Sequence, residues 1–432
     1  MNVWLVTIGE PVPVQEGARD RLHRTGYFAH FLGDHGHEVT WWTSTFDHFR
    51  KRHLFMEDSM IKLRPNLRVR LLKGCGYRNN LSLARMRDHR QIAKKFASEA
   101  IAAPRPDLLV AALPTIELSL ESVLFGKREG VPVVLDMRAM WPDIFMDSAP
   151  APARPLARLV LGPLFSQAHA ACAGATAITG ITKAFVDWGL ARGGRKRSAF
   201  DKAFHMGYTI VPPPPEAIAK AEIYWNNLGI TKEGGDFVAC FFGNVGRQFD
   251  LGTVIDAARL LRREGRKFRF VLCGVGDMLD HFKKMAADIR TVLFPGWVGA
   301  AEIYVLMRRA SVGLDPLPDR YDFLASINNK AIEYMSAGLP VLSSPNRGIL
   351  RDLLAEHRCG LSCQLGNARE LAATLCTLND DRDLLAELSQ NAARLFEQTF
   401  QAENVYAAMM NYLGEVHRDY FARRAFANRG AT

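Results

Sequence analysis

The 432-residue sequence lacks the cysteine pattern of a disulfide scaffold or a zinc site. Its seven cysteines are an odd number, lie scattered along the chain and include no Cys-x-x-Cys pair. We therefore expect reduced core cysteines in a cytosolic protein. With 48% hydrophobic and 23% charged residues, the composition is that of an ordinary globular protein of about two domains. It excludes intrinsic disorder and collagen.

Long uncharged apolar runs are also missing. No run approaches the roughly 18 to 20 residues of a membrane-spanning helix, so we expect the protein not to cross a membrane. The first eight residues have no basic leader and are typical of a strand, so we expect no signal peptide. Both expectations point to a cytoplasmic protein.

Motifs of several other chemistries are incomplete. Gly274 and Gly276 begin a dinucleotide fingerprint, but Leu279 stands where its third glycine belongs, which disfavours a nicotinamide enzyme. The Asp-x-Asp at 381–383 precedes a helical stretch and is better explained as a helix cap than as a metal site. We therefore expect no cofactor and no bound metal. Because zinc-finger spacing, RNP-type strands and basic repeats are absent, we expect no nucleic-acid partner.

The excess of positive charge is confined to the first half of the chain. Residues 1–210 hold 29 Lys+Arg against 19 Asp+Glu, and residues 211–432 hold 26 against 26. This asymmetry indicates an anionic partner such as an acidic lipid surface or a phosphorylated substrate, with a merely solvated basic face as the alternative. The segment Ala153–Phe165 joins Arg154 and Arg158 to an apolar run, which suits either an anionic membrane leaflet or ordinary helix packing.

Short apolar runs alternate with helical stretches, which predicts an α/β fold with mostly parallel sheets. The runs expected to be strands are 3–8, 38–43, 67–72, 108–112, 131–136 and 175–179, then 237–242, 268–273, 291–294, 312–314, 340–343 and 360–363. The four prolines at 212–215 predict a linker. We expect a first domain over 1–210, a linker over 211–235, a second domain over 236–402, and a C-terminal helix over 403–432 that packs back on the first domain.

The most informative stretch is Ser326–Ser344. Asn328 or Asn329 can cap a helix that Gly338 ends. The free amides at the start of that helix form an anion site, to which Lys330 adds a full charge suited to a diphosphate. Glu333, one turn further on, can accept hydrogen bonds from the hydroxyls of a ribose. The alternative is an amphipathic helix with a solvated glutamate.

The segment Asn329–Val341 resembles the donor-binding signature of the GT-B glycosyltransferases, specifically of the retaining glycosyltransferase family 4. Other segments are similar to the family's landmarks: 241–250 with 254–258, 271–277, 36–40, 136–143 and 205–208. The resemblance implies two doubly wound Rossmann-like domains facing across a cleft. In such domains ligands bind at the carboxyl ends of the strands, which agrees with a site in that cleft.

On this resemblance, Glu333 matches the second glutamate of the family's motif and holds the donor ribose, whereas Ala325 stands in place of the first. Asn244 and Asp250 occupy the positions of two family cations, so we expect Arg247 and Lys330 together to neutralise the diphosphate and to act in catalysis. The other expected donor-binding residues are Gly243, Asn244, Gly274, Asn328 and Asn329. For Gly243 a tight strand-to-helix turn is the alternative.

The acceptor side is predicted from the first half. The loop that begins at Gly17 resembles a family loop beside the donor sugar, and Arg24 opens the first helix. Asp136, Arg138 and Asp143 lie at the carboxyl end of a predicted strand and can orient an acceptor hydroxyl or phosphate. A structural ion pair between Asp136 and Arg138 is the alternative.

Together these features predict a glycosyltransferase that moves a hexosyl or N-acetylhexosaminyl group from a nucleotide-sugar donor, with UDP as the expected nucleotide. The acceptor would be lipid-linked or a saccharide, in cell-surface polysaccharide synthesis at the inner face of the plasma membrane. The resemblance implies retention of the anomeric configuration. Two alternatives remain: a nucleotide-sugar epimerase or hydrolase on the same fold, and a non-catalytic nucleotide-binding scaffold subunit.

Overall fold

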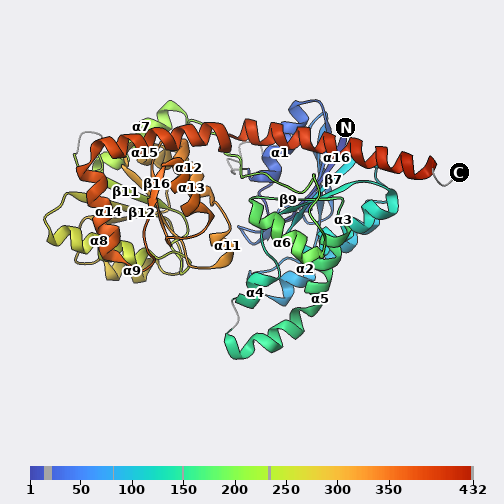
Figure 1. The fold of residues 1–432 in the computed structure, drawn as a ribbon, viewed down its shortest axis with the longest axis horizontal. Helices are drawn as coiled ribbons and strands as arrows, with labels where there is room; N and C mark the ends of the chain where they lie inside the picture. Colours follow the sequence, from blue (N-terminus) through green and yellow to red (C-terminus); the bar gives the residue numbers. More distant parts are fainter. Residues whose placement is uncertain (14–21, 81, 148–149, 232–234, 430–432) are drawn as a thin grey trace. The chain divides into compact units, whose positions relative to one another are not determined.

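The chain folds into two compact units, each built around its own sheet (Figure 1). The computed structural model describes residues 1–13, 22–80, 82–147, 150–231 and 235–429. Unit 1 comprises Met1–His205 and Val405–Thr432, and unit 2 comprises Met206–Asn404.

The sheet of unit 1 has eight strands in the order β10-β9-β8-β7-β1-β2-β6-β5. These strands are β1 (Asn2–Val6), β2 (Glu38–Ser44), β5 (Ser59–Arg64), β6 (Leu67–Leu72), β7 (Leu108–Leu113), β8 (Val133–Met137), β9 (Ala177–Gly180) and β10 (Lys202–Ala203). All neighbours are parallel except β5, which runs antiparallel to β6 at the edge. The order reverses between β1 and β7, as in a doubly wound sheet.

Aromatic packing fixes the helices of unit 1 to this sheet. Trp4 of β1 stacks on Phe125 at 5.2 Å between ring centroids and meets Phe96 edge-on at 6.4 Å. Such pairs contribute about 0.5–1.5 kcal/mol each beyond their buried area.

Besides the sheet and the C-terminal helix, unit 1 contains helices, a 3-10 turn and a small ribbon. The helices are α1 (Arg24–Asp34), α2 (Leu83–Glu99), α3 (Ile116–Glu129), α4 (Asp143–Asp147), α5 (Arg154–Gly174) and α6 (Lys183–Gly193). The 3-10 turn is η1 (Ala151–Ala153), and the ribbon consists of β3 (Phe46–Asp47) and β4 (Arg52–His53).

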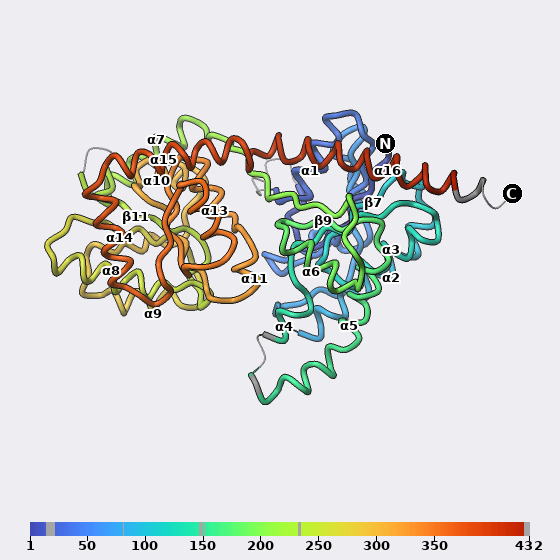
Figure 2. Tube along the Cα trace, viewed as in Figure 1, coloured from blue at the N-terminus to red at the C-terminus, as the bar shows by residue number. Residues whose placement is uncertain are grey.

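The C-terminal helix α16 (Ala402–Arg429) runs beside α1 (Figure 2). Tyr406 stacks on Phe28 of α1 at 5.7 Å between ring centroids. The side chains that α16 buries recur at helical spacing. They are Val405, Tyr406, Met409, Tyr412, Leu413 and Val416. The last segment of the chain therefore completes the core of unit 1.

The sheet of unit 2 has six parallel strands in the order β13-β12-β11-β14-β15-β16. They are β11 (Phe237–Phe242), β12 (Phe268–Cys273), β13 (Val292–Gly296), β14 (Val312–Pro316), β15 (Val341–Ser344) and β16 (Gly360–Ser362). In chain order this is the arrangement 3-2-1-4-5-6 of a nucleotide-binding Rossmann sheet, whose order reverses between β11 and β14. The α/β fold class of two Rossmann-like, GT-B-type domains is thus present.

The first helix of unit 2 begins earlier than the sequence predicts. The helices of this unit are α7 (Pro215–Asn227), α8 (Leu251–Arg263), α9 (Leu279–Met285), α10 (Ala300–Arg309), α11 (Tyr321–Leu324), α12 (Asn329–Ser336), α13 (Ile349–His357), α14 (Ala368–Asp380), α15 (Arg382–Leu395) and the π-helical turn η2 (Phe396–Phe400). Helix α7 lies inside the segment predicted to be a linker. Pro215 takes its first position, where proline needs no amide partner, and Trp225 is fully buried in the core of unit 2.

Two further sequence expectations concern membranes and cysteines. Among the helices in the described ranges, none combines the length and the apolar character needed to cross a bilayer. All seven cysteines are free, and five of them are buried. Cys75 differs from the expectation because it is exposed.

Candidate functional site

The loops that follow β11 and β12 pack backbone against backbone. The Gly243 amide donates to the Cys273 carbonyl at 3.1 Å, and the Gly274 amide donates to the Gly296 carbonyl at 2.7 Å. A Cβ atom on Gly274 would lie 1.8 Å from the Gly243 oxygen, and the Gly274 φ is +137°. Only glycine fits there, so contact between the two loops by itself requires Gly274.

The first loop exposes Gly243, Asn244 and Arg247 at the carboxyl end of β11. Arg247 lies 3.5 Å from Asp277, a carboxylate at the turn after β12, and both side chains are largely exposed. A contact of this kind between exposed charges contributes little to stability, at most about 1 kcal/mol. The Arg247 guanidinium is therefore accessible to a ligand.

Helix α12 begins beside this loop with the predicted cap. The Asn328 side chain accepts a hydrogen bond from the Ala331 amide at 3.2 Å, and Asn329 is the first helical residue, exposed to solvent. Gly338, with φ +66°, follows the end of the helix, and Leu339 and Pro340 lead into β15. The start of α12 thus presents amides to an anion at the β11/β14 reversal of the sheet.

Lys330 is fixed in place by its surroundings. Its Nζ lies 3.8 Å from Asp315 Oδ1 and 3.9 Å from the centre of the Phe249 ring. A Cβ atom on Gly243 would lie 3.6 Å from Lys330 Cδ, which brings the lysine against the first loop. Burial lowers the pKa of Lys330, while Asp315 and Glu333 oppose that shift. The result is an oriented cation beside exposed backbone amides, which suits a diphosphate.

Glu333 is buried, with 6% of its surface exposed, one turn beyond Lys330 on α12. Ala325, at the position of the family's first glutamate, is also buried and lies just after α11. The structure thus brings Gly243, Lys330 and the Asn328 cap together, with Glu333 on the same helix. The ligand-binding roles of these residues stay predictions.

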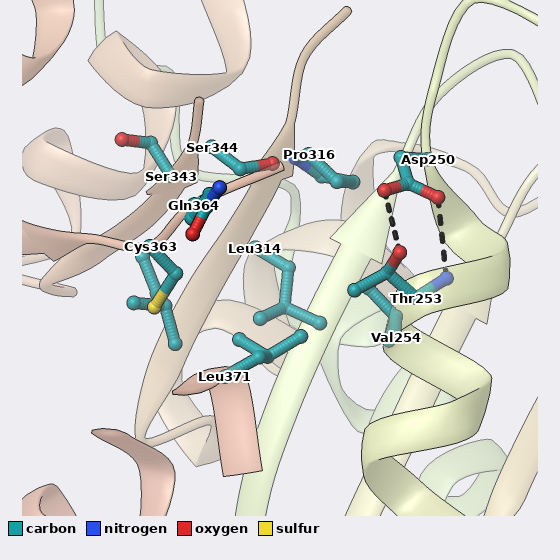
Figure 3. A pocket seen from close by; sticks show the side chains of 11 residues that line it. Asp250, Thr253, Val254, Leu314, Pro316, Ser343, Ser344, Cys363, Gln364 and Leu371 are labelled. Carbon is teal, nitrogen blue, oxygen red and sulfur yellow. Dashed lines mark hydrogen bonds between the residues drawn. The ribbon is translucent and has the colours of Figure 1, made fainter. Parts of the chain in front are cut away.

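Asp250 stands at a position where the family that the sequence resembles has a cation, and here it caps a helix. Its two carboxylate oxygens accept from the Thr253 amide at 3.2 Å and the Thr253 hydroxyl at 2.6 Å, which caps α8 (Figure 3). The neighbouring cavity, lined among others by Ser343 and Gln364, has a volume of only about 20 Å³. It has room for water and not for a nucleotide.

The acceptor residues predicted in unit 1 form a buried ion network. Arg24 Nε lies 3.0 Å from Asp136, whose carboxylate also binds Arg138 Nε at 2.8 Å and accepts from Thr179 at 2.9 Å. Arg138 additionally pairs with Glu10. Burial alone would raise the pKa of Asp136, but Arg24 and Arg138 hold it well below its usual range. The ion pair between Asp136 and Arg138, which the sequence analysis gave as the alternative, is present in the structure.

Of the two remaining residues predicted for the acceptor side, the structure describes only Asp143. Asp143 begins α4 and accepts from Trp188 Nε1 at 2.6 Å and from Arg192 at 2.6 Å, so its carboxylate is engaged within unit 1. Gly17 lies outside the described residues.

Sequence reasoning missed Asp315 and Phe249, which position Lys330. Asp315 is fully buried at the end of β14, and burial raises its pKa against the opposing effects of Lys330 and Asn328. A charged residue at the carboxyl end of an otherwise apolar strand was the available signal. Two exposed apolar residues were also missed: Val275 after β12 and Trp297 after β13, with exposed fractions of 54% and 76%.

The Asp-x-Asp segment has the predicted capping role. Asp381 accepts from the Leu384 amide at 2.8 Å at the start of α15. Over the part of the chain that the structure describes, no group of three or more His, Cys, Asp or Glu side chains is arranged to hold a metal ion.

The donor-site residues lie in a segment that matches a known family of enzymes. Residues 236–381 match the family of group 1 glycosyl transferases. Two curated relatives align with this chain: the amylovoran biosynthesis glycosyltransferase AmsK of Erwinia amylovora, 28% identical over 167 residues, and the putative colanic acid biosynthesis glycosyltransferase WcaL of Escherichia coli K12, 26% identical over 168 residues. Each alignment covers 38% of this chain and 41% of the relative.

Solved structures resemble the whole fold. HepE of Anabaena, crystallised with UDP, aligns over 96% of this chain and 99% of its own with a TM-score of 0.65 and 16% identity. Sucrose-phosphate synthase of Thermosynechococcus elongatus aligns over 98% of this chain and 99% of its own with a TM-score of 0.70 and 16% identity. HepE has also been crystallised with UDP-glucose.

Proposed function

We propose that the protein is a glycosyltransferase that transfers a sugar from a UDP-sugar to a lipid-linked or saccharide acceptor in cell-surface polysaccharide synthesis. The group 1 glycosyl transferase match over 236–381 supports the reaction class. The names of both curated relatives support a role in polysaccharide synthesis. The UDP and UDP-glucose complexes of HepE support a uridine donor.

The observation that carries the proposal is the position of Lys330 at the capped start of α12. Its ammonium is oriented by Asp315 and Phe249 and lies against the Gly243 loop. Negative charge grows on the diphosphate as the glycosidic bond breaks. A cation and helix amides fixed in advance therefore stabilise the transition state more than the bound substrate. In this proposal Arg247 adds a second charge from the exposed end of the first loop.

The rest of the nucleotide would lie along the same edge of the sheet. Glu333 would accept hydrogen bonds from the ribose hydroxyls, as its match to the family glutamate implies. The exposed side chains of Val275 and Trp297 would contact the base, because the Gly274–Gly296 hydrogen bond holds their two loops together. This subsite needs no divalent metal to hold the phosphates, since Lys330 and Arg247 supply the charge.

Retention of configuration is the stereochemical outcome we propose. The bond between the anomeric carbon and the phosphate oxygen breaks, and a bond to the acceptor oxygen forms on the same face. The acceptor hydroxyl gives its proton to the departing phosphate oxygen. The protein then needs no nucleophile and acts by binding and orienting the reactants.

We also propose that the enzyme works at an anionic membrane surface. The first half of α5 exposes Leu156, Leu159 and Val160 by 65%, 76% and 60% of their surfaces, with Arg158 on the same helix. The sequence has no acidic residue between Asp147 and Asp187. An apolar helix face on a segment without acidic residues suits the interface of an anionic leaflet.

The test is calorimetric titration of UDP, GDP, ADP and CMP into the wild type and into Glu333→Ala, in buffer with EDTA. We expect UDP to bind selectively. We expect Glu333→Ala to weaken UDP binding by about 1.5–3 kcal/mol, because a charged hydrogen-bond acceptor is lost. Glu356→Ala, which removes an exposed carboxylate from α13 of the same unit, is the matched control and should leave UDP affinity unchanged.

Each outcome has a distinct meaning. Unchanged affinity in Glu333→Ala would overturn the ribose assignment. UDP binding that requires magnesium would overturn metal-independent donor binding. Turnover of UDP-glucose without an acceptor would favour an epimerase or hydrolase, and failure of every nucleotide to bind would overturn the donor site.

A further inference from the structure

A cluster of cations and aromatic rings lies over the carboxyl ends of the strands of unit 1. Lys51 comes from the turn between β3 and β4, and Tyr77 from the loop after β6. Arg85 lies in the first turns of α2, and Trp141 follows β8. Four segments that are separate in sequence thus meet at the edge where open α/β sheets bind their ligands.

The two cations share one aromatic ring. Lys51 Nζ lies 4.9 Å from the centre of the Tyr77 ring, and the Arg85 guanidinium carbon lies 5.4 Å from it. The Arg85 guanidinium carbon also lies 4.6 Å from the centre of the Trp141 ring. Aromatic faces attract cations, so they hold both groups without neutralising them.

The polar partners of both cations are neutral. Arg85 donates to the Asn80 carbonyl at 2.9 Å and to His89 Nε2 at 3.3 Å, and Lys51 donates to the Asn80 side chain. Within the described ranges neither cation has a carboxylate oxygen within 4.0 Å. Burial, with Arg85 next in effect, lowers the pKa of His89 to about 3, which keeps this imidazole uncharged.

Two half-buried positive charges with no carboxylate in contact, among the described residues, favour binding of an anion. Burial lowers the pKa of Arg85. Burial together with Arg85 lowers the pKa of Lys51, and the Asp47 carboxylate, which does not contact the Lys51 ammonium, opposes that shift. Asp88 and Glu117 oppose the shift of Arg85 without contacting it. Charges that are partly desolvated and close to a like charge are costly until an anion pairs with them. A phosphate suits this pair, because guanidinium groups bind its oxygens in a planar fork.

Exposed apolar side chains adjoin the two cations. Phe49, on the same turn as Lys51, exposes 58% of its surface, and Leu83, at the start of α2, exposes 80%. A ligand that carries a phosphate and an apolar chain would contact both kinds of surface at once.

We propose that Lys51 and Arg85 bind the phosphate or diphosphate group of the acceptor, with Tyr77 and Trp141 holding Arg85 in position. Phe49 and Leu83 would contact an apolar chain attached to that phosphate. The word acceptor rests on the proposed function, whereas the anion site rests on the geometry of unit 1.

The test is calorimetric titration of the full chain with geranyl diphosphate, inorganic pyrophosphate and glucose 1-phosphate. We expect Arg85→Gln and Lys51→Gln each to weaken geranyl diphosphate binding about ten- to 100-fold, since each removes a charged hydrogen-bond donor. Arg87→Gln removes the same charge from an exposed position on the same helix and should change the affinity less than about twofold. Lys330→Gln should leave this binding unchanged, which separates it from the donor site.

Thermal unfolding of each variant accompanies the titrations. If Arg85→Gln does not fold, Arg85→Lys and the more exposed Lys51→Gln decide, and equal binding by wild type and Lys51→Gln would overturn the proposal. Tighter binding of geranyl diphosphate than of pyrophosphate assigns a lipid source, and equal affinities assign a phosphate without a contacting chain. If UDP fails to bind while the Arg85-dependent binding persists, the proposed function fails and the anion site stands.

Discussion

Asp136 is a carboxylate whose partners occupy it fully. It is completely buried at the end of β8 and binds Arg24, Arg138 and Thr179. Arg24 in turn donates to the His205 carbonyl at 2.7 Å. The network therefore joins α1 to His205, where the chain leaves unit 1. A residue with these contacts acts through the stability of unit 1.

Asp136→Asn should destabilise unit 1 at pH 7 by about 3–5 kcal/mol, because it leaves Arg24 buried without its counter-ion. The folded pKa of Asp136 is held below that of the unfolded chain. Its stabilisation is therefore fully present above about pH 4, where the unfolded carboxyl is ionised, and is lost as the pH falls further. Calorimetric unfolding of wild type and variant at pH 7 and pH 3 should show the gap between them narrowing in acid.

Asp187→Asn is the matched control for this experiment. Asp187 pairs with Lys183 and Arg197 at the surface, where ion pairs contribute at most about 1 kcal/mol. A loss in Asp187→Asn as large as in Asp136→Asn would contradict the assignment of the effect to burial.

Single residues of the donor site could be predicted where the signal is local. The Asn328 cap and the placement of Lys330 one residue into the helix follow from spacing along one segment. Asp315 and Phe249 could not be predicted as partners of Lys330, because each reaches it from a different strand or loop of unit 2. The ion pair between Arg24 and Asp136 could likewise not be predicted, because the two residues are 112 positions apart in the sequence.

At the scale of elements, the start of α12 combines a cap with a buried charge. Asn328 accepts from the Ala331 amide and also donates to the Asp315 carboxylate. Asn328→Ala should therefore lower the stability of unit 2 by at least the roughly 0.5–2 kcal/mol of a lost cap. It should also weaken UDP binding, because Lys330 and the first amides of α12 lose their support. Denaturant titration of both variants measures the free energy of unfolding. Asn329→Ala, at the exposed neighbouring position, should leave it unchanged. Equal losses of stability in both variants would exclude a specific role of the cap.

Helix α5 gives the second prediction at this scale. Leu156→Ser combined with Leu159→Ser should reduce binding to vesicles of phosphatidylcholine and phosphatidylglycerol about tenfold or more, since burying a leucine contributes about 1.5–3 kcal/mol. Co-sedimentation measures the bound fraction. Ile223→Ser replaces an equally exposed residue of α7 in unit 2 and should bind as the wild type does. Failure of the wild type to bind anionic vesicles would contradict the membrane role.

Strands were easier to predict than the short connecting elements. All twelve predicted runs contain strands, because most of them are continuously apolar or β-branched, while 67–72 alternates apolar residues with arginine as a strand does. The ribbon β3–β4 was missed because two-residue strands carry no periodicity. Helix α7 was missed because four consecutive prolines indicate extended chain, although the last of them can also start a helix.

At the scale of the whole molecule, the path of the chain makes unit 1 depend on its last segment. The chain leaves unit 1 after His205, forms all of unit 2, and returns at Val405. The Tyr412 hydroxyl donates to the Phe200 carbonyl at 2.7 Å, and Tyr406 stacks on Phe28. The core of unit 1 is therefore incomplete until α16 has been synthesised.

This dependence predicts different fates for the two units after truncation. A chain that ends at Asn404 loses six buried apolar side chains of α16, and at about 1.5–3 kcal/mol each their loss is comparable to the whole stability of a domain. Unit 1 should then unfold while unit 2 retains UDP binding. A chain that ends at Asp419 keeps all six and should unfold at the wild-type temperature. Calorimetry of the three chains, with UDP titration of each, decides the matter: a folded unit 1 in the shorter chain would show that α16 is dispensable for its core.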